Sequence, residues 1–85
     1  MINKYNKVIS QFIKRKTYSN TYINLSDNKH LEIENCKKIL EYNDVYVKII
    51  TSTLTISIYG RELNISDYNT DGIIVDGIFS SIEFE

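Results

Sequence analysis

The stretch Val45-Tyr-Val-Lys-Ile-Ile-Thr-Ser-Thr-Leu-Thr-Ile-Ser-Ile-Tyr59 decides the fold of this chain. Apolar and polar residues alternate through both of its halves, which are separated by the polar residues 51–53. Alternation of β-branched residues with a period of two is typical of half-buried strands. Two strands so close in sequence pair antiparallel, because a parallel crossover needs about a dozen residues or more. The stretch therefore predicts a central hairpin with two inward-facing rows, Val45, Val47 and Ile49 on the first strand and Leu54, Ile56 and Ile58 on the second.

The length and composition fit one small domain rich in strands. Eighty-five residues are enough for a single domain with a modest core. The apolar residues are mostly Ile, Tyr, Val and Leu, and the absence of Pro leaves the turns to Gly, Asn, Asp and Ser. Cys36 is the single cysteine, which excludes an intramolecular disulfide and indicates a reducing compartment. Because the N-terminus has no apolar run long enough for a signal peptide or a membrane span, we expect the chain to stay in the cytoplasm.

Residues 2–16 are predicted to form a basic amphipathic helix, and residues 1–20 as a whole are taken as this helix with its linker. Apolar residues recur there every three or four positions, and the basic residues lie largely off that stripe. No acidic residue occurs before Asp27. A helix this short is marginal in water and needs a surface, which is its own sheet, a partner protein or an anionic membrane. Its candidate contact residues are Ile2, Tyr5, Val8, Ile9, Phe12, Ile13, Lys14, Arg15 and Lys16.

Residues 21–85 are predicted to form an all-β domain of about seven or eight short strands. Strand-like alternation appears at 22–25 and 30–36, and the adjacent apolar pair Ile39-Leu40 indicates a bulge or a change of sheet face. Because the connections are short, sequence neighbours should pair, which favours a small antiparallel sandwich or a barrel-like roll. A short β-solenoid is the alternative, since the same tight corners can step between rungs. Turns are predicted at 26–29, Asn43-Asp44, Gly60-Arg61, 67–72 and Asp76-Gly77.

No residue pattern points to catalysis, a cofactor or a metal. His30 is the only histidine, and no motif places a Ser or Cys partner beside it. Glu32 and Glu34 share one face of a strand, which allows a paired-carboxylate site, but a solvated strand face is the simpler interpretation. Seven tyrosines could stack on nucleic-acid bases, but the acidic β domain would repel phosphates. We therefore predict that the chain is not an enzyme and binds no cofactor, metal or nucleic acid.

Three segments of the chain carry a resemblance to a known family: His30-Leu-Glu-Ile-Glu-Asn-Cys-Lys-Lys-Ile-Leu-Glu-Tyr-Asn-Asp44, Gly60-Arg-Glu-Leu-Asn-Ile65 and Gly72-Ile-Ile-Val-Asp-Gly-Ile-Phe-Ser-Ser-Ile-Glu-Phe84. They contain an Ile-Glu-Asn strand, a Gly-x-x-Leu-x-Ile strand start and a closing strand after a glycine. From Leu25 onward the chain resembles the YabP/YqfC family of sporulation proteins found in endospore-forming Firmicutes. The short length and the basic N-terminus resemble the YqfC branch of that family. These motifs are turns and core positions. The family has no catalytic residues, so the resemblance assigns none to this chain.

The resemblance implies a non-enzymatic protein that acts in the mother cell at the developing spore surface. Its expected location is the cytoplasm, peripheral at the forespore outer membrane or in the spore coat. The YqfC branch implies other sporulation proteins as partners, one of them membrane-anchored. Two hypotheses follow: an assembly module that works by protein–protein contact and self-association through a strand edge, or a small membrane-surface- or ligand-binding module that uses the basic helix. A polar pocket would favour a ligand, whereas a flat sheet edge or an apolar patch would favour assembly.

Overall fold

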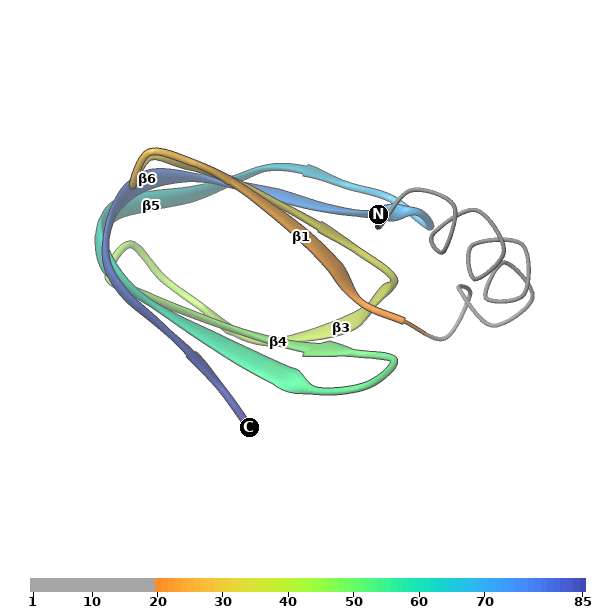
Figure 1. Ribbon diagram of the computed structural model, residues 1–85. Coiled ribbons are helices and arrows are strands. Elements are labelled where there is room, and N and C mark those ends of the chain that lie inside the picture. Colours follow the sequence, from red (N-terminus) through yellow and green to blue (C-terminus); the bar gives the residue numbers. More distant parts are fainter. Residues whose placement is uncertain (1–19) are drawn as a thin grey trace, which may run out of the picture.

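The computed structural model describes residues 20–85, which form one six-stranded antiparallel sheet without a helix (Figure 1). The order of the strands across the sheet is β1-β2-β6-β5-β4-β3. The predicted helix at 2–16 lies outside the described residues. The strands are β1 (Tyr22–Ser26), β2 (His30–Glu34), β3 (Cys36–Tyr42), β4 (Tyr46–Thr51), β5 (Thr55–Tyr68) and β6 (Gly72–Phe84).

The two longest strands, β5 with 14 residues and β6 with 13, bend and fold the single sheet into two layers. The first half of β5 pairs with β4 and with the second half of β6. The second half of β5 pairs with the first half of β6, which also pairs with β2. One layer therefore contains β3, β4 and the segments 55–59 and 79–84, and the other contains the remaining strand segments. Figure 1 shows the layers one above the other, joined where β5 and β6 curve.

The predicted turns at Gly60-Arg61 and Asp76-Gly77 are wrong, because both sites lie inside continuous strands. The pairing of β5 with β6 shifts register between Tyr59 and Gly60 and again between Arg61 and Asn64. Such bulges bend a strand without taking it out of the sheet. Residues that suit a turn therefore form the bend instead, and six strands replace the seven or eight that the sequence predicts.

The predicted turns at 26–29 and Asn43-Asp44 are confirmed, the second with Val45 as a third residue. The Asn43 side chain accepts hydrogen bonds from the backbone N–H groups of Val45 and Tyr46, both at 2.9 Å. Val45 is consequently held in the turn and is 52% exposed, so its predicted place in the inward-facing row is wrong. The predicted loop at 67–72 is shortened to 69–71, because its outer residues belong to β5 and β6.

The core lies between the two layers, and four of the six residues predicted to face inward in the central hairpin are fully buried. Val47 and Ile49 of β4 stand opposite Ile58 and Ile56 of β5, and all four side chains are fully buried. Leu54 is half-buried and packs against this cluster. The other buried apolar side chains come mainly from the opposite layer: Leu31, Ile33, Leu63, Ile73, Val75 and Phe79.

The two layers do not close into the predicted sandwich or barrel. Among residues 20–85, the end strands of the sheet order, β1 and β3, each pair with a strand on one side only. The β-solenoid alternative is wrong, because all neighbouring strands in the sheet are antiparallel whereas a solenoid stacks parallel rungs.

A single residue, Asn35, carries the chain from β2 in one layer to β3 in the other. Its φ of 64° lies in the left-handed region, which Asn tolerates better than most residues. Its backbone N–H donates to the Asp71 carbonyl (3.0 Å), and its own carbonyl accepts from Ser52 (3.1 Å). We call this end, with Asn35 and the turns 52–54 and 69–71, the mouth. It lies opposite the bend of β5 and β6.

The described chain begins at the mouth. The Asn35 side-chain amide donates to the Asn20 carbonyl. The Thr21 hydroxyl donates to the Thr51 hydroxyl at 2.5 Å and is 2.8 Å from the Thr53 hydroxyl. These contacts fix the point from which β1 starts along its layer.

Candidate functional site

The edge formed by β3 is protected against the addition of another strand. It carries Lys37, Lys38 and Glu41, and its pairing with β4 shifts register twice. The second shift, between Ile39 and Glu41, confirms the predicted bulge. Charged side chains and bulges are two devices by which proteins block edge-to-edge association.

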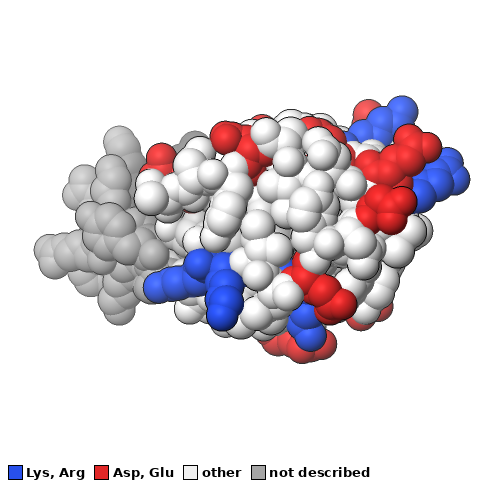
Figure 2. Space-filling model, turned by 180° about the vertical axis from the view of Figure 1, so that it is seen from behind, with Lys and Arg blue, Asp and Glu red and all other residues white. Residues whose placement is uncertain are grey.

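Seen from behind (Figure 2), the described residues carry both signs of charge around a largely uncharged middle, so this face has no single-sign patch.

The edge formed by β1 lacks those devices. Its sequence, Tyr22-Ile-Asn-Leu-Ser26, contains no charge, and all five residues are exposed. It pairs with β2 residue for residue, without a register shift. The outer N–H and C=O groups of a regular, uncharged edge strand are free to pair with another strand. The β1 edge is therefore the better candidate for a contact surface.

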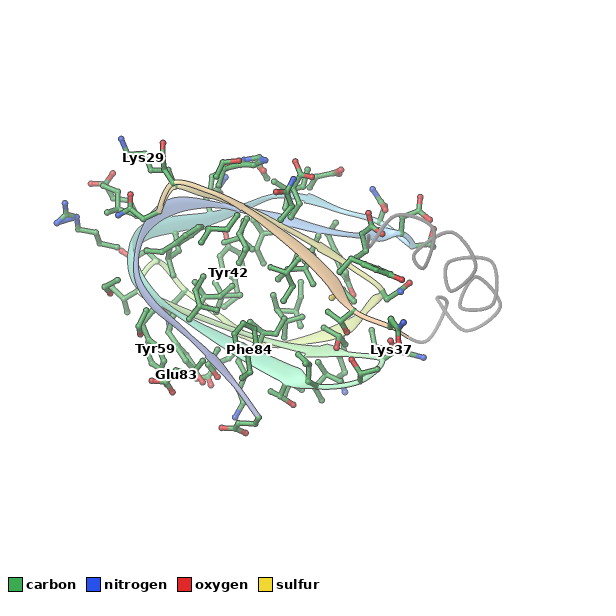
Figure 3. The ribbon with its side chains drawn as sticks, in the orientation of Figure 1. Lys29, Lys37, Tyr42, Tyr59, Glu83 and Phe84 are labelled. Carbon is green, nitrogen blue, oxygen red and sulfur yellow. The ribbon has the colours of Figure 1, made fainter. Side chains whose placement is uncertain are left out.

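One side of the molecule, between β3 and the second half of β5, is closed by side chains and by a turn. The Tyr42 hydroxyl accepts a hydrogen bond from the Ile65 backbone N–H (3.1 Å) and lies 3.3 Å from the Asn64 side-chain oxygen. The Asp44 carbonyl accepts from the Leu63 N–H at 2.9 Å. Figure 3 shows Tyr42 between the two layers. These contacts join the two layers from β3 to β5.

On the opposite side, between β1 and the second half of β6, the described residues form backbone hydrogen bonds near the bend. There the Phe79 N–H donates to the Asn28 carbonyl (2.8 Å) and the Gly77 N–H donates to the Lys29 carbonyl (3.1 Å). Beyond these bonds, the described chain places no strand against the outer edge of residues 80–84, which pair only with β5. Two strand edges, β1 and 80–84, thus border one gap.

Apolar side chains line this gap from both layers. Ile23 and Leu25 stand opposite the buried Ile33 and Leu31, so they share the inward-facing side of their layer. In the other layer Ile82 and Phe84 stand opposite the buried Ile58 and Ile56. Even so, Ile23 is 39% exposed, Leu25 49% and Phe84 55%, and Ile82 is only half-buried. Figure 3 labels Phe84 near the C-terminus. We call Ile23, Leu25, Ile82 and Phe84 the apolar opening.

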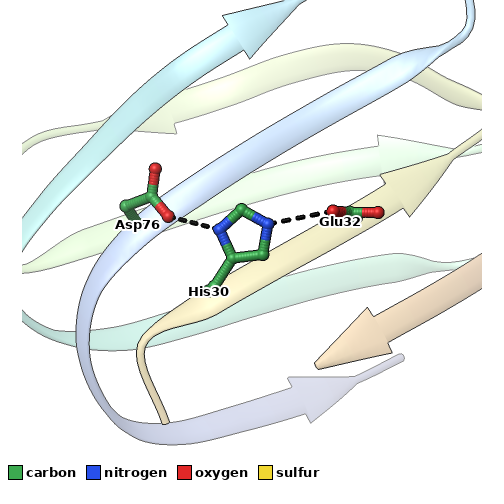
Figure 4. Close-up of polar contacts among 3 residues, drawn as sticks. All are labelled: His30, Glu32 and Asp76. Carbon is green, nitrogen blue, oxygen red and sulfur yellow. Dashed lines mark hydrogen bonds and ion pairs between the residues drawn. The ribbon is translucent and has the colours of Figure 1, made fainter. Parts of the chain in front are cut away.

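A polar cluster of His30, Glu32 and Asp76 lies on the outer side of β2 and β6 (Figure 4). His30 Nδ1 is 2.6 Å from an Asp76 oxygen, and Nε2 is 2.9 Å from a Glu32 oxygen. The hydrogen bond to Glu32, and then that to Asp76, raises the pKa of His30. Hydrogen bonds from Ser66 and then His30 lower the pKa of Asp76.

This cluster is a hydrogen-bonded network on the protein surface, and its contacts are ion pairs when His30 is protonated. Both ring nitrogens of His30 already face carboxylates, so neither is available to take a proton from a substrate. The sequence singled out Glu32 and Glu34 as a pair, but the structure joins Glu32 to His30 instead. Asp76 is 46 residues away from His30 in the sequence, and no local sequence pattern predicts their contact.

A shallow hollow of about 440 Å³ lies on the outer surface beside the mouth. Its charged lining consists of carboxylates, among them Glu34, Asp67 and Asp71. Ligand pockets are typically enclosed and mostly apolar, with a few convergent polar groups, and this hollow is neither. Within residues 20–85, no group of His, Cys, Asp and Glu side chains is arranged to hold a metal ion. Burial raises the pKa of the half-buried Cys36 thiol, which disfavours the reactive thiolate.

The nine candidate contact residues in the predicted helix, Ile2 to Lys16, lie outside the described residues, and their role stays a prediction. The features that sequence reasoning missed are the positions of the β1 edge and of the 80–84 edge, and the apolar opening between them. The alternation of Ile23 and Leu25 was visible in the sequence, but their exposure follows from the position of β1 at the end of the sheet order.

Comparison with known proteins agrees with the resemblance drawn from the motifs. The model of the YabP family matches residues 17–85, which include all six strands. No curated protein and no solved structure matches the chain. Within residues 20–85, no helix is long and apolar enough to cross a membrane. The YabP family is a family of sporulation proteins that is not known for catalysis. The match covers well over half of the sequence, and the chain therefore belongs to the YabP family of sporulation proteins.

Proposed function

We propose that this chain is a non-enzymatic assembly module that works by protein–protein contact at the developing spore surface. It acts in the mother-cell cytoplasm, peripherally at the forespore outer membrane or in the spore coat. Family membership supports the link to sporulation. The basic residues near the N-terminus suit the YqfC branch, which adds a larger membrane-anchored sporulation protein to the proposed partners.

The observation that carries this proposal is the uncharged and regular edge of β1, all five residues of which are exposed. A strand that adds to such an edge forms main-chain hydrogen bonds and covers alternate side chains. Here it would cover Ile23 and Leu25, each of which is between a third and a half exposed. Burying the exposed part of such a side chain stabilises the association by about 1 kcal/mol. The protected β3 edge offers no comparable surface.

The proposal predicts that a charge on β1 impairs sporulation. Leu25→Lys places an ammonium group on the β1 edge, where a partner strand would have to desolvate it. Leu40→Lys is the matched control, because Leu40 is a similarly exposed leucine (43% against 49%) on the already charged β3 edge. In the sporulating host, we expect the count of heat-resistant spores to fall sharply for Leu25→Lys and to stay near wild type for Leu40→Lys. Thermal melts of both purified variants check that neither unfolds. Equal spore counts would contradict the proposed contact through β1.

A second function, binding to an anionic membrane surface, is favoured by the charge of the N-terminal segment. It contains Lys4, Lys7, Lys14, Arg15 and Lys16 and no acid. Each basic residue near an anionic surface contributes about 1 kcal/mol. The apolar residues that accompany them in the sequence suit insertion into the interface.

This second function predicts binding to phosphatidylglycerol-containing vesicles that weakens with salt, because added ions screen surface charge. Deleting residues 1–16 should abolish binding, and vesicles of phosphatidylcholine alone serve as the control. The thermal midpoint of the deletion variant is a separate readout. It should barely change if the segment is an arm, and it should drop clearly if the segment covers the core. Absence of binding at low salt would remove the membrane function.

A further inference from the structure

We propose that a second copy of this chain closes the apolar opening, with β1 of each copy pairing with residues 80–84 of the other. This inference rests on the proposed protein–protein role and names one partner, the chain itself. Its starting point is that two strand edges that pair with no strand of residues 20–85 border the same gap.

The directions of the two edges suit such a pairing. β1 is antiparallel to β2, and β2 is antiparallel to the first half of β6, so β1 runs from the mouth toward the bend. Residues 80–84 run back from the bend toward the mouth. The two edges therefore run antiparallel to each other on opposite layers. Figure 1 shows both on the near side of the molecule.

A twofold axis that follows the opening, parallel to the strands, fits these directions. Such an axis preserves the direction of every strand and exchanges the two layers. It brings β1 of one copy beside residues 80–84 of the other in antiparallel orientation, and it does so twice. An interface of this kind is closed and self-complementary, so it forms a dimer and not a fibre. Each layer would continue from one copy into the next.

The side chains suit the same arrangement. The inward-facing residues of β1, Ile23 and Leu25, would meet Ile82 and Phe84 of the other copy on the same side of a continuous layer. This contact would cover the exposed apolar side chains of both layers in one step. A single apolar patch on both partners is what an isologous dimer requires.

The charges favour this pairing over the other edge combinations. β1 carries no charge, and residues 80–84 carry only Glu83, so no like charges face each other. Pairing 80–84 with itself would bring the Glu83 carboxylates of two copies together. Pairing β3 with itself would oppose Lys37 and Lys38 with their own copies. Pairing β1 with itself would leave Phe84 exposed and the 80–84 edge unpaired.

Sedimentation equilibrium of the full chain tests the dimer. We expect a dimer in the micromolar range, a dissociation constant raised at least about tenfold by Leu25→Lys, and no change for Leu40→Lys. A monomer at all concentrations up to millimolar would overturn the inference, and so would equal weakening by both variants. If the chain dimerises only after deletion of residues 1–16, its own N-terminal segment is the occupant and the second copy is not.

Cysteine cross-linking tests the geometry. In a Cys36→Ser background, Leu25→Cys and Phe84→Cys proteins are mixed and oxidised. We expect the mixed disulfide between the two variants to form faster than either homodisulfide. Dominance of the Leu25→Cys homodisulfide would show β1–β1 pairing and overturn the proposed arrangement.

The two proposals fail differently. A monomeric chain whose Leu25→Lys variant still blocks sporulation would remove the dimer and leave the proposed function. If Leu25→Lys breaks the dimer but does not change spore counts, the proposed function is removed and the dimer stays.

Discussion

Replacing Ile56 by Asp is expected to abolish the cooperative thermal unfolding of this domain. Ile56 is fully buried on β5, between Ile49 of β4 and Phe84 of β6. The substitution loses roughly 1.5–3 kcal/mol of side-chain burial. It also places a carboxylate without a partner in the core, which lowers the free energy of unfolding by several kcal/mol more. A domain of this size has a free energy of unfolding of about 5 kcal/mol or slightly more. The two losses together are comparable with all of it.

Circular dichroism melts and scanning calorimetry measure this effect. Asn64→Asp is the matched control, because it adds the same carboxylate at an exposed position of the same strand. It also keeps a side-chain oxygen near the Tyr42 hydroxyl. The control should melt within a few degrees of wild type. If Ile56→Asp does the same, the inward-facing side of β5 has been assigned to the wrong residues.

The central hairpin was predictable because its signal is local. Period-two alternation fixes which side chains share a face, and Val47, Ile49, Ile56 and Ile58 are buried as that pattern requires. The Asn43-Asp44 turn is local in the same sense, since one side chain bonds to the backbone two and three residues on.

The bend and the opening were not predictable, because both depend on contacts between distant residues. Gly60-Arg61 and Asp76-Gly77 have the composition of turns, yet each lies opposite a strand that keeps the chain extended. β2 pairs with β6 and not with its successor β3, which leaves β1 at one end of the sheet order. His30 meets Asp76 through the same non-local pairing. The sequence contains the residues that form these features, but it does not show which distant residues they contact.

Gly60→Ala is expected to destabilise the domain nearly as severely as a core substitution, although Gly60 is only half-buried. A Cβ atom at this position would lie 2.1 Å from the Ile78 carbonyl oxygen and 3.0 Å from the Phe79 Cα. Both neighbours are backbone atoms of β6, so no side-chain rotation relieves the clash. β5 and β6 would have to separate at the bend that holds the two layers together. Overpacking of this kind costs roughly 3 kcal/mol.

A loss of that size lowers the melting temperature of a domain this small by about 15 °C. Ser81→Ala is the control, because Ser81 is exposed and stands opposite Tyr59, the residue before Gly60. Its effect should stay within about 0.5 kcal/mol. Both substitutions change the side-chain volume only slightly, and they lie at adjacent residue pairs between β5 and β6. The difference between their melting temperatures therefore measures the contact between the backbones of β5 and β6 at Gly60. A Gly60→Ala protein that melts together with Ser81→Ala would mean that β6 does not press against Gly60. The chain would then have room to reverse there, and the turn that the sequence predicts at Gly60-Arg61 would describe it better than a bent strand.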